Sequence, residues 1–312
     1  MTRTTTHSYT DLDVTVAGGA LRVGVWEPEP SSASDAPTPT VLAVHGITAS
    51  HQAWPAVAAA LPGVRVVAPD LRGRGRSNHL PGPFGMGAHA DDLAAVLKAV
   101  AAGPVVVLGH SMGGFASVVL AHRYPHLVSR LVLVDGGLPL PPPAGLPEGA
   151  THEEVLQALL GPAVERLGRT FASREAYRDF WRAHPAFAGA WDEVVEGYVD
   201  YDLVETGAGL RPATSPEAVA HDSLDLYEGG PLMEALLGPD PVRVPITLLR
   251  APRGLLDEPG GLYPAATVED WTGRLPGLVV REVAGVNHYT IIMSPAGVAA
   301  VAEEISTVEE DR

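Results

Sequence analysis

The chain has 312 residues, of which 46% are hydrophobic and 19% charged, a balance typical of a globular protein with a large core and not of a disordered one. Its formal charge of −16, from 37 acidic and 21 basic residues, argues against nucleic acids and anionic membranes as partners, because such a surface repels phosphate. The chain has no cysteine, which excludes disulfides, thiolate catalysis and thiolate metal sites.

Nothing in the sequence indicates a membrane span or a secretory signal. No stretch approaches the roughly 18 uninterrupted apolar residues that a spanning helix needs. Residues 1–10 lack the apolar segment of a signal peptide. We therefore expect a soluble, cytoplasmic protein.

The first element is a β-hairpin over residues 12–27, where apolar and polar residues alternate around Gly18-Gly19. A loop rich in Pro, Ser and Ala follows at 28–39. Short continuous apolar runs then predict strands buried on both faces, at 40–44, 64–68, 105–108, 131–134, 246–249 and 278–283. Helix candidates lie between them, at 51–61, 87–101, 112–123, 266–274 and 295–306. This alternation predicts an α/β fold with a mostly parallel, doubly wound sheet.

The alternation is interrupted between residues 137 and 240. A proline-rich stretch opens this segment, and amphipathic helices are expected at 151–168, 173–183 and 190–204. We interpret it as a helical cap, or lid, inserted between two core segments, 1–136 and 241–312, above the sheet edge where such folds bind ligands. We expect most of its aromatic residues to form the cap's own core and a few, with Trp181 and Trp191 as candidates, to face the ligand.

A serine nucleophile is indicated by Gly109-His110-Ser111-Met112-Gly113, a G-x-S-x-G motif directly between an apolar strand and an apolar helix. A sharp strand-to-helix turn places the serine in strained geometry, and the flanking glycines remove the clashes that the turn would cause. The helix N-terminus then offers the Met112 N–H to a developing oxyanion.

With this motif in place, the chain resembles the α/β-hydrolase superfamily of serine-nucleophile, capped carboxylesterases and lactonases. His45-Gly46-Ile47-Thr48 is similar to the family's oxyanion loop, and residues 70–77 are similar to its D-x-R-G-x-G-x-S loop. The resemblance implies an oxyanion hole built from the N–H groups of Ile47 and Met112. It also implies that His45 is structural.

The general base is expected to be His288, in Gly285-Val286-Asn287-His288-Tyr289, between the last strand and the last helix. A serine needs a base whose pKa lies near neutrality, and the fold places that base after its last strand. His110 is the competitor because it adjoins Ser111. Neighbouring residues on a tight turn point apart, however, so we assign His110 a supporting position.

Two aspartates compete for the role of the acid that orients His288 and completes the catalytic triad. Asp135 follows the strand after the nucleophile helix, and Asp257 lies a few residues beyond the strand at 246–249. Relatives in the superfamily use both placements. We favour Asp135 and retain Asp257 as the alternative acid.

These assignments predict a hydrolase that cleaves a hydrophobic carboxylic ester or lactone, with a bulky macrolactone such as zearalenone among the plausible substrates. C–C bond hydrolysis and perhydrolysis of the same fold are alternatives, and a non-catalytic ligand receptor on a hydrolase scaffold is a further one. We expect no cofactor and no metal, since His152-Glu153-Glu154 lacks the second histidine of H-E-x-x-H. The sequence does not indicate an oligomeric state.

Overall fold

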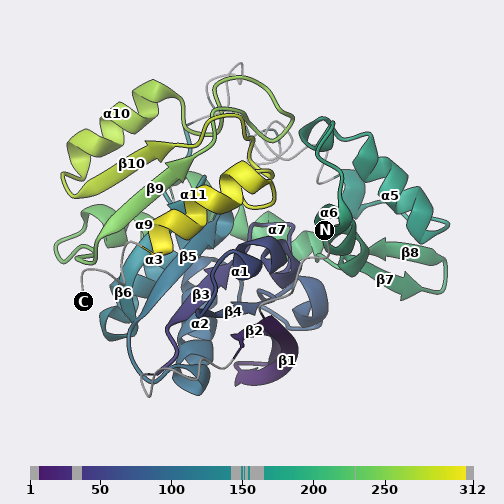
Figure 1. Ribbon diagram of the computed structural model, residues 1–312, viewed down its shortest axis with the longest axis horizontal. Coiled ribbons are helices and arrows are strands. Elements are labelled where there is room, and N and C mark those ends of the chain that lie inside the picture. The colour runs from purple at the N-terminus through teal and green to yellow at the C-terminus, as the bar shows by residue number, and fades with distance from the viewer. Residues whose placement is uncertain are drawn as a thin grey trace.

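A computed structural model of the protein describes residues 7–29, 37–141, 149, 151, 154, 165–228 and 230–306 (Figure 1). Its strands are β1 (His7–Val16), β2 (Gly19–Pro28), β3 (Thr40–Val44), β4 (Arg65–Pro69), β5 (Val105–His110), β6 (Val128–Val134), β9 (Ile246–Arg250) and β10 (Leu278–Glu282). They form one sheet in the order β1-β2-β4-β3-β5-β6-β9-β10. The strands from β4 to β10 are parallel, while β1 and β2 are antiparallel to their neighbours. The mostly parallel, doubly wound sheet is therefore confirmed.

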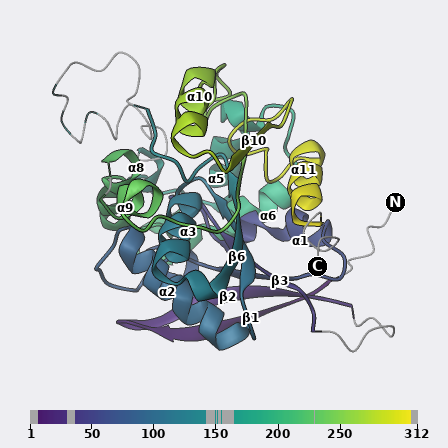
Figure 2. The ribbon, with the colours of Figure 1, turned by 90° about the vertical axis from the view of Figure 1, so that its left-hand side faces the viewer.

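The central strands are apolar on both faces because helices cover both. In β3, Leu42 and Val44 belong to one core cluster, while Val41 and Ala43 belong to the other. Helices α2 (Met86–Val100), α3 (Met112–Arg123) and α10 (Ala265–Arg274) contribute to the first cluster. Helices α1 (Pro55–Ala59) and α11 (Pro295–Ser306) contribute to the second, and Figure 2 shows α2 and α3 across the sheet from α11.

One helix of the core is shorter than expected. Instead of a helix over 51–61, the structure has a 3₁₀ turn at His51–Ala53 followed by α1. The reason is Pro55, which cannot donate a backbone hydrogen bond to the preceding turn and is well suited to the first position of a new helix.

Between β6 and β9 the chain leaves the sheet. The described part of this insertion contains α5 (Arg174–Arg182), α6 (Glu193–Tyr201), a hairpin of β7 (Leu203–Thr206) and β8 (Gly209–Pro212), α7 (Pro216–Asp222), α8 (Asp225–Glu228) and α9 (Gly230–Leu237). Figure 1 shows α5, α6 and the hairpin projecting to one side of the sheet. The predicted helix at 190–204 is wrong at its C-terminal end, because the chain turns back through Gly207 and Gly209 as a hairpin. Most of the helix expected at 151–168 lies outside the described residues.

Over the part of the chain that the structure describes, no helix is both long enough and apolar enough to cross a membrane.

Candidate active site

Ser111 occupies the turn between β5 and α3, in a backbone conformation that L-residues rarely adopt (φ 53°, ψ −129°). Glycines make this turn sterically feasible. A Cβ on Gly113 would lie 2.1 Å from the Val44 carbonyl oxygen, and one on Gly136 would lie 2.1 Å from the carbonyl oxygen of Ser111. The strain, of the order of 1–3 kcal/mol for such backbone, is held by this close packing and lifts the hydroxyl above the sheet edge.

His288 and Asp135 form a buried pair. The Nδ1–H of His288 donates to Oδ2 of Asp135 at 2.7 Å, and both side chains are almost fully shielded from solvent. The other oxygen of Asp135, Oδ1, accepts from the backbone N–H of Ala251 at 3.0 Å. With both oxygens engaged as acceptors, the carboxylate fixes the ring so that its Nε2 carries the lone pair.

Asp257, the alternative acid, has other partners. Its carboxylate accepts from Arg253 Nε at 2.8 Å and from Asn287 Nδ2 at 3.1 Å. The hydrogen bond from Arg253 lowers the pKa of this partly exposed carboxyl group. The structure thus places Asp135 on the imidazole and Asp257 in an ion pair beside the His288 loop.

Asn287 has no role in the sequence-based prediction, yet its side chain holds the loop that carries His288. Its Oδ1 accepts from the N–H groups of Tyr289 at 3.1 Å and Thr290 at 3.0 Å, while Nδ2 donates to the Ala186 carbonyl at 2.8 Å. Asparagine is suited to this position because its side chain offers both an acceptor and a donor. The one signal for it in the sequence is its position directly before His288.

His110 supports the same loop from behind. Its Nε2–H donates to the carbonyl oxygen of His288 at 2.8 Å, and the two rings lie 4.7 Å apart. Burial, and then the neighbouring His288, lower the pKa of His110 well below its usual value, so the ring is neutral. Its Nε2 is committed to a backbone carbonyl, while its Nδ1 is buried and has no hydrogen-bond partner among the described residues.

The loop at 45–48 lies beside the nucleophile. His45 accepts from the Leu71 N–H at 2.9 Å and donates to the Gly46 carbonyl at 2.8 Å, and burial lowers its pKa to about 3. Arg74 Nε donates to the Ile47 carbonyl at 2.8 Å, which fixes the orientation of the peptide that follows Ile47. Met112 is the first residue of α3, where backbone N–H groups have no intrahelical partner.

The loop at residues 70–77 joins this region to the insertion. Asp70 is fully buried and accepts from the His51 Nδ1–H at 2.8 Å and from the Tyr201 hydroxyl at 2.7 Å. Burial alone would raise the pKa of Asp70, but His51 outweighs it and the pKa falls to about 2.

A second buried carboxylate, Asp222 in α7, forms an ion pair with Arg74 and accepts from His89 Nε2 at 2.9 Å. Burial would raise the pKa of Asp222, but Arg74 and then His89 lower it. A buried ion pair with Arg74 and a buried hydrogen bond with His89 therefore hold the insertion against the core.

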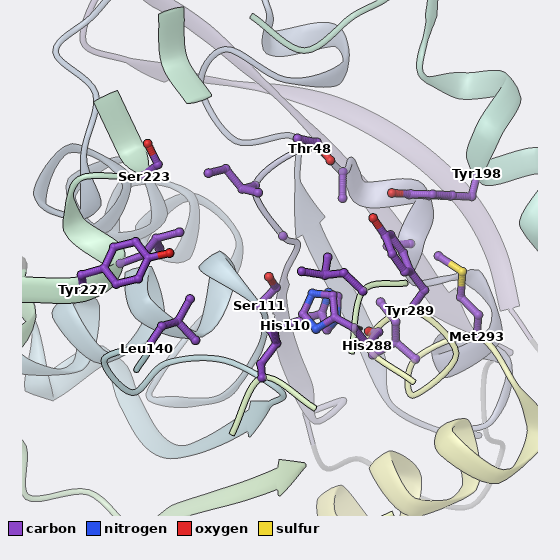
Figure 3. A pocket seen from close by; sticks show the side chains of 18 residues that line it. Thr48, His110, Ser111, Leu140, Tyr198, Ser223, Tyr227, His288, Tyr289 and Met293 are labelled. Carbon is purple, nitrogen blue, oxygen red and sulfur yellow. Dashed lines mark hydrogen bonds between the residues drawn. The ribbon is translucent and has the colours of Figure 1, made fainter. Parts of the chain in front are cut away.

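Ser111 and His288 line one mostly apolar cavity (Figure 3). The insertion supplies part of its wall: Leu140, Tyr198, Ser223, Leu226 and Tyr227. Trp181 is 3% exposed and packs edge-on against Phe187 in the insertion's own core, while Trp191 packs under Arg182. The expectation that these two tryptophans face the ligand is wrong, whereas Tyr198 and Tyr227 do line the cavity.

Within the described residues, no three His, Asp or Glu side chains gather as a metal site would require.

Known proteins share this sequence pattern and this fold. A family model described as alpha/beta hydrolase fold matches residues 39–178. Lipase LipV of Mycobacterium tuberculosis is 33% identical over 213 residues, which cover 68% of this chain and 74% of that protein. The 2-(acetamidomethylene)succinate hydrolase of Mesorhizobium japonicum is 26% identical over 264 residues, 82% of this chain and 84% of that one.

Among solved structures, that of E-2-(acetamidomethylene)succinate hydrolase superposes with a TM-score of 0.73 at 22% identity, covering 96% of this chain and 100% of the other. An esterase of Mycobacterium tuberculosis, Rv0045c, superposes with a TM-score of 0.66 at 22% identity, covering 97% of this chain and 92% of the other. At these identities the likeness establishes the fold.

Proposed function

Since the chain belongs to the α/β-hydrolase family, we propose that it is a serine hydrolase that cleaves hydrophobic carboxylic esters through an acyl-enzyme. The observation that carries the proposal is the 2.7 Å bond between His288 Nδ1 and the buried Asp135, since His288 lines the same cavity as the strained Ser111. The lipase and esterase names among its relatives agree with an ester substrate.

In the first half of the proposed reaction, Ser111 Oγ attacks the ester carbonyl carbon while His288 Nε2 takes the hydroxyl proton. The resulting imidazolium is stabilised by Asp135, which already accepts the Nδ1–H. The carbonyl oxygen becomes an oxyanion, for which we propose the N–H groups of Ile47 and Met112 as donors. His288 then protonates the leaving alcohol, and the acyl group stays on Ser111.

In the second half, water attacks the acyl-enzyme. His288 takes a proton from this water, a second tetrahedral intermediate forms at the same oxyanion site, and its collapse releases the carboxylic acid and returns the proton to Ser111. A lactone is a cyclic ester and follows the same steps, so macrolactones such as zearalenone stay within the proposed substrate class.

We further propose that the segment at 137–240 is a cap that shapes the substrate site on a core formed by 1–136 and 241–312. In support, Leu140, Tyr198, Leu226 and Tyr227 contribute to the cavity wall, while Ser111, His288 and Asp135 all lie on the core. The mostly apolar wall fits a hydrophobic substrate.

The test is hydrolysis of p-nitrophenyl esters of increasing acyl length, combined with labelling by a fluorophosphonate probe. Wild-type protein should turn over the esters and should be labelled at Ser111, and Ser111→Ala should do neither. Thermal unfolding of both proteins checks that the variant is folded. Labelling of another serine, or esterase activity that persists in folded Ser111→Ala, would refute the proposal.

A further inference from the structure

Two phenol hydroxyls at one end of the cavity have no hydrogen-bond partner among the residues that the structure describes. Tyr198 of α6 and Tyr289, directly after His288, both line the cavity, and the two residues are 5% and 8% exposed. Figure 3 shows both hydroxyls directed into the same part of the cavity, near Thr48. No hydrogen bond joins either hydroxyl to another of the described residues, and the buried hydroxyl of Tyr227, elsewhere on the cavity wall, also has no partner among them.

Such an arrangement points to a ligand, because buried polar groups nearly always have hydrogen-bond partners. The partner of these hydroxyls must come from what fills the cavity, either water or a polar group of the substrate. A site that offers unpaired donors discriminates strongly between substrates that do and do not satisfy them.

The two rings are held firmly, so their hydroxyls are fixed in place. Tyr289 packs against Phe187 with ring centroids 5.2 Å apart and against Trp181 at 6.0 Å. Tyr198 packs edge-on against the same Trp181 at 6.4 Å. The buried core of the insertion therefore supports both hydroxyls from behind.

The charges around this end favour a neutral acceptor as the ligand group. Arg166 lies behind the wall, where the carboxylate of Asp202 balances its charge and one NH₂ group also donates to the Tyr177 hydroxyl, while its Nε has no partner among the described residues. No Lys or Arg is among the described residues that line the cavity. Burial raises the pKa of Tyr198 and of Tyr289, which keeps both as neutral O–H donors.

We propose that Tyr198 and Tyr289 bind a second, neutral carbonyl oxygen of the substrate, so that the enzyme prefers an oxo-substituted ester over a plain alkyl ester of the same length. The inference rests on the proposed function and narrows its substrate class. The remaining wall, with Leu226, Leu255 and Leu262, fits the hydrocarbon part of the same molecule.

The test compares matched p-nitrophenyl esters, in which one CH₂ of the acyl chain is replaced by C=O at successive positions, with 4-oxopentanoate against pentanoate as the shortest pair. Alkyl esters with the ketone in the alcohol chain complete the panel. In at least one pair, wild-type kcat/KM should favour the oxo ester by about tenfold or more. Tyr198→Phe and Tyr289→Phe should each remove that preference, and kcat/KM for the plain ester should change much less.

Tyr227→Phe is the matched control. Tyr227 also lines the cavity and its buried hydroxyl also lacks a partner among the described residues, but it lies across the cavity from Tyr198 in Figure 3. This variant should keep the oxo preference. The proposal is wrong if no pair shows a preference, if the preference survives in both Phe variants, or if Tyr227→Phe removes it. A preference for a hemisuccinate ester over its uncharged analogues would also overturn it.

The two proposals fail in different ways. If the enzyme hydrolyses no ester in the panel, the proposed function fails. If it hydrolyses plain and oxo esters equally through Ser111, the proposed function stands and only the role of the two tyrosines is refuted.

Discussion

Replacing Asp135 by asparagine should reduce kcat by about four orders of magnitude while leaving the fold intact. The size of the loss follows from the two hydrogen bonds of this carboxylate. Oδ1 accepts from the Ala251 N–H at 3.0 Å, and Oδ2 accepts from the His288 Nδ1–H at 2.7 Å. An asparagine has one oxygen and one NH₂ group for these two positions.

The Ala251 N–H can only donate, so the oxygen of the introduced amide is drawn to it and the NH₂ group faces His288. His288 Nδ1 must then accept, and its proton moves to Nε2, the nitrogen that has to take the proton of Ser111. The same wrong tautomer in a serine protease costs about 10⁴ in kcat, equivalent to about 5.4 kcal/mol of transition-state stabilisation.

The assay is the kcat for a p-nitrophenyl ester, measured beside thermal unfolding. Asp257→Asn is the matched control, because its carboxylate pairs with Arg253 and Asn287 and has no contact with the imidazole. It should lower kcat less than about tenfold. A large loss in Asp257→Asn together with near-normal activity in Asp135→Asn would refute the reasoning.

Four further outcomes are expected. Gly46→Ala should lower kcat about tenfold or more without unfolding the protein, because the new Cβ would lie 3.1 Å from the Cβ of Ser111 and would displace the nucleophile. Unchanged kcat would contradict this. Trp181→Ala should cost about 3–5 kcal/mol in the free energy of unfolding and leave the preference for ester length within about twofold, as checked by urea unfolding and kcat/KM. Asp222→Ala should lower the free energy of unfolding by about 3–5 kcal/mol, because the Arg74 guanidinium would stay buried without its carboxylate. A loss below about 1 kcal/mol in urea unfolding would show that the ion pair contributes little. Asp70 has a folded-state pKa of about 2 against an ordinary value of 3.8, so its contribution of about 2 kcal/mol to the free energy of unfolding is present above pH 3.8 and disappears as the pH falls through 2. Urea unfolding at several pH values should therefore show a steeper loss of stability in the wild type than in Asp70→Asn, and equal slopes would contradict this.

The sheet could be predicted because its central strands are buried on both faces. Residues 41–44 of β3, 105–109 of β5 and 131–134 of β6 are all apolar or glycine, and such runs differ plainly from the amphipathic helices between them. The turn at Ser111 could also be predicted from the sequence, because its close backbone contacts leave no room for a Cβ and therefore require glycine at positions 109, 113 and 114.

The choice of acid could not be settled from the sequence. Asp135 and Asp257 both follow parallel strands, β6 and β9, that are neighbours in the sheet. Which carboxylate reaches His288 depends on the path of two loops, and residue patterns do not encode that path.

The insertion is the least predictable part. Periodicity indicates that α5 has an apolar face, but it does not tell which neighbour that face meets, so the prediction places Trp181 at the ligand although it lies in the insertion's core. Tyr198 of α6 lies at the cavity instead. The hairpin after α6 is not predicted, because the helical pattern of residues 190–204 continues into its first strand and only Gly207 and Gly209 indicate a turn.

The contacts of Arg74 limit where segments can be exchanged between relatives when substrate preference is to be changed by recombination. The same guanidinium donates to the Ile47 carbonyl on one side and pairs with Asp222 of the insertion on the other. A chimera that received a foreign cap but kept loop 70–77 would leave this cation buried without its carboxylate, beside the backbone proposed to hold the oxyanion. Loop 70–77 and the segment from Tyr201 to Asp222 therefore form one unit of exchange, and recombination breakpoints belong outside both.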